Sequence, residues 1–488
     1  MSDRSPQQLQ PHPAVPERGF AGESRPRCEA VPERAGWRYH PRRMAGLWRS
    51  KALRAGAVVT VLALSGLVIL ALVREQTGTE GFLVGLGLAV LPVPLLAAAF
   101  RWLDRVEPGP WKNLVFAFSW GAFAAALVAI IANTFATRWI ATATADPTSA
   151  DTLGATVIAP VVEESAKAAA VLLIFLFRRR DFTGIVDGVV VAGFTATGFA
   201  FTENILYLGN AFGEDQEFGT SGFESVTAAT FFVRIVMSPF AHPLFTVLTG
   251  IGFGIAAGAA ATGAAGRGRR IRRWGLPSLG LVLAMGVHAL WNGSAAAFGP
   301  YGFYIVYAGF MVPAFALLTW LAVWTRQREL RTVGARLPEY AAAGWLQPLE
   351  PMALSSMRAR RVAREYARRA YGPAGTGSAA ARTVAEYEGY ATALAFLRHR
   401  AHQGAAGAEF VAREQELLRC LWERRGVAGP ALVHAARVTG RVVWVPAQGY
   451  GMGAPVPHQR APHPGAAYPG AAYPGAPYPY AGYNPYRA

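Results

Sequence analysis

Residues 153–177 have the sequence LGATVIAPVVEESAKAAAVLLIFLF, which is apolar except near its centre. At a rise of about 1.5 Å per residue, a helix of this length can cross the hydrocarbon core of a bilayer. Glu163, Glu164 and Lys167 lie in the middle of this stretch. Because a charged residue at the centre of a membrane helix costs roughly 3 kcal/mol, ionisable groups there indicate a functional site.

The whole chain has the composition of a membrane protein. Of its 488 residues, 52% are hydrophobic and 16% are charged, whereas about 25% of the residues in soluble domains are charged. The net charge of +17 does not indicate a nucleic-acid partner, because the arginines gather in the connections between apolar segments. The two cysteines, Cys28 and Cys420, form neither a disulfide framework nor a metal motif. We expect an all-α polytopic protein embedded in the lipid bilayer.

The apolar segments predict about eight transmembrane helices. They lie at residues 53–73, 80–100, 113–133, 153–177, 183–208, 228–260, 276–297 and 301–324. Every second connection between them is basic, which predicts a multi-pass protein of the cell membrane with both termini in the cytoplasm.

The sixth segment is too long for one upright span. Ser238–Pro239 predicts a break between a short helix at 228–237 and a span at 239–260, because proline removes a helical hydrogen bond. Within that span, Gly250, Gly254 and Gly258 form a stripe of small residues that favours close packing of helices.

Four regions follow from this pattern. Residues 1–50 are predicted to be a disordered cytoplasmic arm, and residues 51–325 an eight-span membrane domain. Residues 326–430 are predicted to form a cytoplasmic helical region, and residues 431–488 a low-complexity tail rich in Pro, Tyr and Gly. Within the helical region, the apolar spacing predicts amphipathic helices whose arginines suit an anionic lipid surface, at 352–370, 378–402 and 408–424.

Polar side chains recur on four successive predicted spans, the fourth to the seventh. They are Glu163, Glu164 and Lys167; Asp187, Glu203 and Asn204; Arg234 and His242; and His288 and Asn292. From the helical rise, Glu163, Glu203, His242 and His288 all fall in the outer half of the bilayer. We therefore expect these four side chains to line one polar cavity that opens toward the outside.

This set of residue types suits hydrolysis of a peptide bond, which requires a base, a water molecule and donors for the oxyanion. We assign Glu163 as the base, supported by Glu164, with Glu203 or His242 positioning the water. His288 and Asn292 lie one helical turn apart and are the predicted oxyanion donors. Four further residues are predicted to pair with these groups or orient them: Lys167, Asn204, Asp187 and Arg234. The chain contains no HExxH zinc motif.

Two other functions fit parts of the pattern. A proton-coupled transporter would use the acids and histidines as a relay. It would also show inverted repeats, and the sequence has no convincing internal duplication. A non-catalytic scaffold for the C-terminal region would gain nothing from charges inside the membrane.

The motifs, in their order along the chain, resemble those of the PrsW family of intramembrane proteases. That family belongs to a superfamily that includes CAAX-processing and bacteriocin-processing proteases. The resemblance covers residues 153–297. It rests on Glu163-Glu164-x-x-Lys167, Asp187-Gly188, Phe199-x-x-x-Glu203-Asn204, His242 and His288-x-x-x-Asn292.

The resemblance implies a polytopic glutamic-type protease that cleaves membrane proteins, typified by site-1 cleavage of an anti-sigma factor on the extracytoplasmic side. Members of the superfamily have also been described as metalloproteases, and a zinc ion would take Glu163, Glu203, His242 and His288 as ligands. We favour hydrolysis without a metal cofactor, with the zinc-dependent version as the alternative. The wider superfamily has His in place of Glu203 and Arg in place of Lys167, so the role of Glu203 stays open.

Overall fold

The computed structural model describes residues 50–179, 181–260, 271–299, 301–403 and 410–440. Within these residues every regular element is helical, which confirms the predicted all-α class. The predicted arm, apart from residue 50, and the predicted tail beyond residue 440 lie outside the described residues. The chain divides into two compact units, residues 1–58 and 59–488. Of the first unit the structure describes only residues 50–58, where α2 begins.

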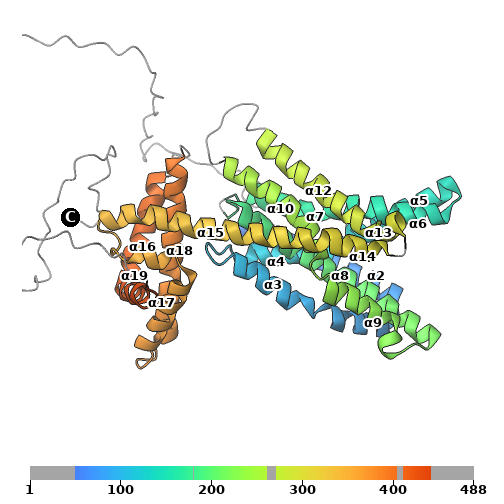
Figure 1. The fold of residues 1–488 in the computed structure, drawn as a ribbon, viewed down its shortest axis with the longest axis horizontal. Coiled ribbons are helices and arrows are strands. Elements are labelled where there is room, and N and C mark those ends of the chain that lie inside the picture. Colours follow the sequence, from blue (N-terminus) through green and yellow to red (C-terminus); the bar gives the residue numbers. More distant parts are fainter. Residues whose placement is uncertain (1–49, 180, 261–270, 300, 404–409, 441–488) are drawn as a thin grey trace, which may run out of the picture. The chain divides into compact units, whose positions relative to one another are not determined.

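Figure 1 shows the elements of the membrane part in their order along the chain. They are α2 (Lys51–Ala89), α3 (Pro92–Leu103), α4 (Trp111–Ser119), η2 (Trp120–Ala125), α5 (Ala126–Thr144), α6 (Pro147–Leu153), η3 (Gly154–Ile158), α7 (Ala159–Phe177), α8 (Ile185–Phe218), η4 (Gly222–Glu224), α9 (Val226–Phe231), η5 (Phe232–Met237), α10 (Ala241–Ala260), η6 (Ile271–Gly275), α12 (Leu276–Asn292), α13 (Ser294–Phe298), α14 (Gly302–Val306), η7 (Tyr307–Met311) and α15 (Val312–Ala342).

Six stretches of described helix are long and apolar enough to cross a membrane. The first, Ala52–Leu103, has 52 residues and would be about 78 Å long as one straight helix, far more than one crossing needs. Gly78 interrupts it with φ 70° and ψ 170°, which fits the two spans predicted there. Helix α7 is not among the six, and it carries three charged side chains. The number of eight spans stays a prediction.

Helix α8 is the central element of the membrane part. In an apolar segment of 18 residues of α8, 83% of the residues are buried, against 44% or less in the corresponding segments of the other five stretches. It also ends ten residues later than predicted, at Phe218 instead of residue 208. Small residues let its neighbours approach: an added Cβ on Gly188 would lie 2.0 Å from the carbonyl oxygen of Gly250 on α10. Because Gly254 lies against Ile185 in the same way, α8 and α10 run antiparallel.

The break predicted at Ser238–Pro239 is confirmed. Helix α9 and the π-helical turn η5 end at Met237, Ser238 has a non-helical backbone (φ −125°, ψ 39°), and α10 begins at Ala241. The hydroxyl of Ser238 donates to the carbonyl of Val233, and the hydroxyl of Tyr307 donates to that of Met237. The Tyr307 bond caps a carbonyl at the end of the helical turn, and the Ser238 hydroxyl adds a second bond to the carbonyl of Val233, which also accepts from the backbone N–H of Ser238.

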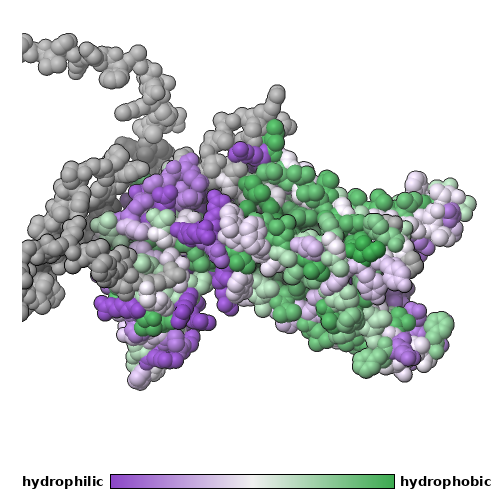
Figure 2. All heavy atoms as spheres, viewed as in Figure 1, coloured by the Kyte–Doolittle hydropathy of each residue, from purple (hydrophilic) through white to green (hydrophobic). Residues whose placement is uncertain are grey.

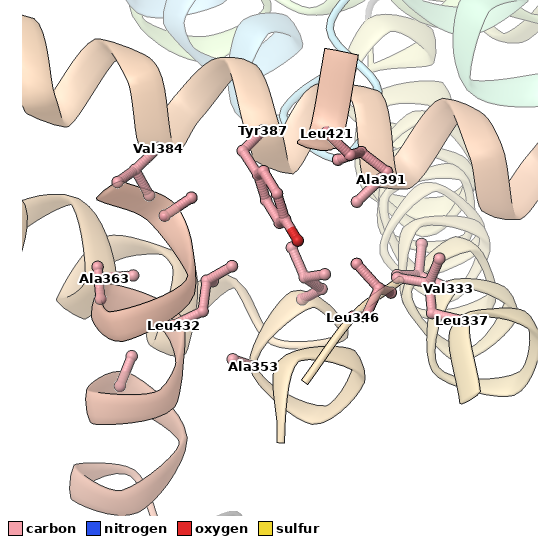
Figure 3. Packing of buried hydrophobic residues seen from close by; sticks show 14 of the residues in the cluster. Val333, Leu337, Leu346, Ala353, Ala363, Val384, Tyr387, Ala391, Leu421 and Leu432 are labelled. Carbon is pink, nitrogen blue, oxygen red and sulfur yellow. The ribbon is translucent and has the colours of Figure 1, made fainter. Parts of the chain in front are cut away.

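The C-terminal residues form a helical bundle. It contains the end of α15, α16 (Glu350–Leu354), α17 (Met357–Ala370), α18 (Gly377–His402) and α19 (Phe410–Val438). The three predicted amphipathic helices are therefore present, but their apolar faces pack on one another around Tyr387 (Figure 3). The domain boundary predicted at residue 325 lies inside the continuous helix α15.

The surface agrees with this division. Figure 2 shows hydrophobic residues over the helices of the membrane part and hydrophilic residues gathered over the C-terminal bundle. Large apolar side chains such as Leu95, Phe135 and Leu317 are more than 60% exposed. Exposure on this scale is expected where lipid is the solvent.

We predict that Gly250→Ala destabilises the membrane part. The added methyl group would meet the carbonyl oxygen of Gly188 at 2.3 Å, and overpacking of this kind costs about 1–3 kcal/mol. Gly258→Ala is the matched control, because nothing lies within 4 Å of the added Cβ. Thermal unfolding of the purified protein in detergent measures both variants, and equal melting temperatures would contradict the close packing of α8 and α10.

We predict that the protection of α18 against hydrogen exchange falls as pH rises. Glu388 is 4% exposed, and burial raises the pKa of its carboxyl from 4.5 to about 7, although Arg364 and Arg360 lower it. The folded state therefore binds this proton more tightly than the unfolded chain. Its contribution to stability is present at low pH and is lost, by up to about 3 kcal/mol, between pH 4.5 and pH 7.

Exchange measured by mass spectrometry on the full-length protein, corrected for the intrinsic effect of pH, tests this dependence. Glu388→Gln should remove it. Glu386→Gln, at a neighbouring side chain that is 54% exposed and pairs with Arg424, should keep it. The same pH profile in all three proteins would show that Glu388 is not the titrating group.

Candidate active site

Helix α7 brings three charged side chains onto one face. The ammonium group of Lys167 donates to Oε1 of Glu164 at 2.9 Å and to Oε2 of Glu163 at 3.3 Å. The spacings of three and four residues place these side chains one turn apart. Glu164 and Lys167 are completely buried and Glu163 is 7% exposed, so a single cation is shared between two carboxylates inside the protein.

Glu164 is held by three helices. In addition to Lys167, its Oε1 pairs with Nδ1 of His288 on α12 at 3.1 Å, and its Oε2 accepts a bond from the hydroxyl of Thr246 on α10 at 2.9 Å. Both oxygens of this carboxylate are therefore occupied. Nε2 of His288 faces the other carboxylate, 3.9 Å from Oε2 of Glu163.

His242, at the start of α10, joins α7 to α8. Its Nε2 lies 2.5 Å from Oε2 of Glu203, and its Nδ1 lies 3.1 Å from the ammonium nitrogen of Lys167. A carboxylate accepts and an ammonium donates, so these partners put the proton of the neutral imidazole on Nε2 and the lone pair on Nδ1. The rings of His242 and His288 are 5.4 Å apart and nearly perpendicular.

Arg234 closes the cluster at its more exposed side. Its guanidinium group donates to Oε2 of Glu203 at 2.6 Å and to Oδ1 of Asn204 at 2.8 Å. It also lies over the ring of Tyr207, 3.9 Å from the centroid. The side chains of Glu203 and Arg234 are 17% and 23% exposed, so water reaches this side of the cluster more readily than Glu164.

Two phenylalanines line the cluster. The ammonium nitrogen of Lys167 lies 3.8 Å from the ring centroid of Phe199, a cation–π contact. The ring of His288 stacks on Phe245 at 4.6 Å with an interplanar angle of 20°. Both phenylalanines are buried, so they restrict the positions of Lys167 and His288 and keep water away from that side of the cluster.

Departures from regular helix surround the site. The π-helical turn η3 comes directly before α7, and η2 lies beside it: the indole N–H of Trp120 donates to the carbonyl of Ala166 at 2.9 Å. The hydroxyl of Thr202 on α8 donates to the carbonyl of Ala122 at 2.6 Å. Such turns expose backbone carbonyls and are frequent near functional sites. Here they connect α7 and α8 to the same neighbouring helix.

The structure thus brings together eight of the ten predicted site residues, and two lie apart from them. Asp187 lies sixteen residues before Glu203 on α8, about 24 Å along the helix. It accepts bonds from the backbone N–H groups of Thr183 and Gly184 and caps the start of α8. The amide of Asn292 donates to the carbonyl of Ala155 at 3.0 Å and is exposed.

Sequence reasoning did not assign a role to Thr246, Phe199 or Phe245. Thr246 lies four residues after His242 and Phe199 four residues before Glu203, so each shares a helical face with a predicted site residue. That spacing was a usable signal for both. Phe245 lies three residues after His242, so the same reasoning applied to it, and its ring contacts both His242 and His288.

Residues 109–318 match the family described as PrsW family intramembrane metalloprotease. The match includes every residue of the cluster. The domain formed by residues 109–318 belongs to the PrsW family. The protein is therefore an intramembrane protease, which confirms the resemblance seen in its motifs. The match is wider than residues 153–297 and includes α4, α5 and the first residues of α15. No curated protein and no solved structure matches the chain.

The PrsW-family domain has side chains that suit a metal ion. Glu163, His242 and His288 each offer one ligand atom, and these atoms lie within 4.8 Å of one another. Histidines that bind zinc commonly donate their other ring N–H to a carboxylate. Here Glu203 holds Nε2 of His242, and Glu164 holds Nδ1 of His288. The residue types therefore fit a zinc site with Glu203 outside the ligand set.

Lys167 competes for that site. An imidazole nitrogen has a single lone pair, and the lone pair on Nδ1 of His242 faces the ammonium group of Lys167 at 3.1 Å. A metal ion can bind Nδ1 only after Lys167 releases it. The positive charge, within 3.3 Å of Glu163 as well, also opposes the approach of a divalent cation.

We predict that Lys167→Met increases the zinc content of the purified protein, because the change frees Nδ1 of His242 and removes a positive charge. Lys112→Met, at an exposed residue of α4, is the matched control. Both variants and the parent protein are incubated with zinc, passed through size exclusion, and measured by elemental mass spectrometry. Equal zinc content in all three would contradict the competition.

Proposed function

We propose that the protein is an intramembrane endopeptidase in which Glu163 activates the hydrolytic water. The observation that supports this choice is the difference between the two neighbouring acids. Both oxygens of Glu164 accept hydrogen bonds. Glu163 has longer contacts, at 3.3 and 3.9 Å, and among the described residues its Oε1 has no hydrogen bond. A base needs an oxygen that is free to accept a proton from water.

Glu203 is a weaker candidate for the base. Its Oε2 is held by Arg234 at 2.6 Å and by His242 at 2.5 Å. Two charge-assisted bonds to one oxygen stabilise the ionised carboxylate. We therefore propose that Glu203 orients His242 and that His242 helps to position the water.

The reaction proceeds in two steps. The carboxylate of Glu163 takes a proton from water while the water oxygen forms a bond to the carbonyl carbon of the substrate, and the carbonyl becomes an oxyanion. When the tetrahedral intermediate collapses, the carbon–nitrogen bond breaks and Glu163 gives its proton to the leaving nitrogen. The products are a carboxylic acid and an amine, and the glutamate returns to its first state.

The oxyanion needs a hydrogen-bond donor. We propose Nε2 of His288 as this donor, because that ring nitrogen faces Glu163 while Nδ1 pairs with Glu164. Asn292 was assigned the same role from its position one turn away. Its amide instead bonds the carbonyl of Ala155, so it would have to turn toward the substrate to contribute. We keep His288 as the principal donor.

The zinc-dependent version uses the same residues in a different way. Glu163, His242 and His288 would hold the ion, and its chemistry would be to acidify a bound water and polarise the substrate carbonyl. Glu203 and Glu164 would orient the two imidazoles. The contact between Lys167 and His242 supports the metal-free version, and the zinc measurement described above tests it.

We propose membrane-anchored proteins as substrates, with an anti-sigma factor as the type implied by the family resemblance. The loop charges support an orientation in which both termini are cytoplasmic and Glu203 and Arg234 lie toward the extracytoplasmic surface. Cleavage on that side would release an extracytoplasmic segment from its anchor.

We predict that Glu163→Gln reduces proteolysis by at least about 1,000-fold, because an amide cannot take a proton from water. New N-termini in the membrane proteome of cells with the parent protein or the variant identify the cleaved proteins and measure the loss together. Glu214→Gln, at an exposed acid of α8, should cleave at the parent rate. Size exclusion and circular dichroism check that Glu163→Gln stays folded. Undiminished cleavage by a folded Glu163→Gln protein would show that Glu163 is not the base.

A further inference from the structure

We infer that Arg234 is a positioning residue for proteolysis: its guanidinium fork holds Glu203, and through Glu203 it sets the orientation of His242. This inference rests on the proposed function. Arg234 lies on η5, a turn that ends before the break at Ser238, whereas the groups that it binds lie on α8. A long arginine side chain in a membrane protein can also reach toward the membrane interface without binding a particular residue.

The contacts of Arg234 are directional. Nε donates to the amide oxygen of Asn204 at 2.8 Å, and Nη2 donates to Oε2 of Glu203 at 2.6 Å. The two acceptors come from adjacent residues of one helix, and Tyr207, four residues after Glu203, supports the flat face of the group at 3.9 Å. A planar guanidinium group satisfies all three contacts at once, and an ammonium group cannot. An arginine that merely reached the interface would not need them.

Arg234 acts on the same oxygen that His242 contacts. Oε2 of Glu203 accepts from Nη2 of Arg234 at 2.6 Å and lies 2.5 Å from Nε2 of His242. The position of this oxygen fixes the plane of the imidazole ring and keeps its proton on Nε2. The Nδ1 lone pair then faces Lys167 beside Glu163. The chain of contacts therefore runs from Arg234 through Glu203 and His242 to the proposed base.

The turn that carries Arg234 is itself fixed. The hydroxyl of Tyr307 on η7 donates to the carbonyl of Met237 at 2.9 Å, and the hydroxyl of Ser238 donates to the carbonyl of Val233 at 2.6 Å. The two accepting carbonyls belong to η5, and a third bond, from the backbone N–H of Ala241 to the carbonyl of Ser238 at 3.0 Å, crosses the break to α10. They hold the backbone of Arg234 and the start of the helix that carries His242 in one arrangement, which a positioning residue requires.

The decisive comparison is Arg234→Lys with Arg234→Gln. We expect both to lower kcat by about 10- to 100-fold, as changes to residues that orient catalytic histidines do, while KM changes by less than about threefold. The lysine variant keeps the positive charge and loses the fork. Activity of Arg234→Lys at the parent level would overturn the inference and leave only a role in charge neutralisation. Asn204→Ala, which removes one contact of the fork, should give a smaller loss of kcat.

A double-mutant cycle tests the route through Glu203. If Arg234 acts through that carboxylate, Arg234→Gln should change the activity of a Glu203→Gln protein by less than about twofold, because coupled residues are not additive. Multiplicative losses in the double variant would show that Arg234 acts by another route. Arg138→Gln is the control for loss of an arginine, since its guanidinium has no hydrogen bond or ion pair within the described residues, and it should cleave at the parent rate.

The assay uses the full-length protein in liposomes and a tagged membrane protein that the parent protein cleaves. Size exclusion and thermal unfolding of each variant check that it is folded. Cleavage by a folded Glu163→Gln protein defeats the proposed function whatever Arg234 does. If Glu163→Gln loses activity and Arg234→Lys keeps the parent activity, the inference about Arg234 is wrong and the proposed function stands.

Discussion

The contact between Lys167 and Glu164 is the interaction on which the rest of the site depends. Both side chains are completely buried, and an unpaired charge in such a place costs several kcal/mol. The ammonium group of Lys167 contacts two carboxylates on α7 and one imidazole on α10. Glu164 also pairs with His288 on α12. One buried ion pair therefore fixes three helices relative to one another and allows a further carboxylate, Glu163, to remain beside them.

A second cation, nearer the surface, also pairs with a carboxylate. Arg234 pairs with Glu203 where both side chains are partly exposed, so the pair carries a smaller desolvation penalty than Lys167 and Glu164. His242 connects the two layers, with one ring nitrogen on each. The buried layer gives the site its rigidity, and the layer at the rim is where water and a peptide can arrive. Our assignment of Glu163 as the base follows from its less occupied carboxylate, beside the fully bonded Glu164.

Much of this arrangement was predictable because it depends on local spacing. The break at Ser238–Pro239 follows from the chemistry of proline, and the pairing of Lys167 with Glu163 and Glu164 follows from helical periodicity. The gathering of Glu203, His242 and His288 was predictable because the helical rise places all three in the same half of the bilayer on successive helices. The contact of Asn292 with Ala155 was not, because it depends on how α12 is rotated against η3. The packing of α17, α18 and α19 on one another was likewise invisible, since arginine-rich amphipathic helices suit a lipid surface equally well.

The sequence by itself determined the helical class, the family and the residues that carry charge into the membrane, because each of these follows from composition and from spacing along one chain. The tertiary structure decided which partner each charge has. It gave Glu164 three partners and left Glu163 with an open oxygen, although the two are neighbours in sequence and chemically identical. That difference comes from Thr246, His288 and Lys167 meeting at one point, and the rotation and approach of three helices, set by side chains distant in sequence, bring them there.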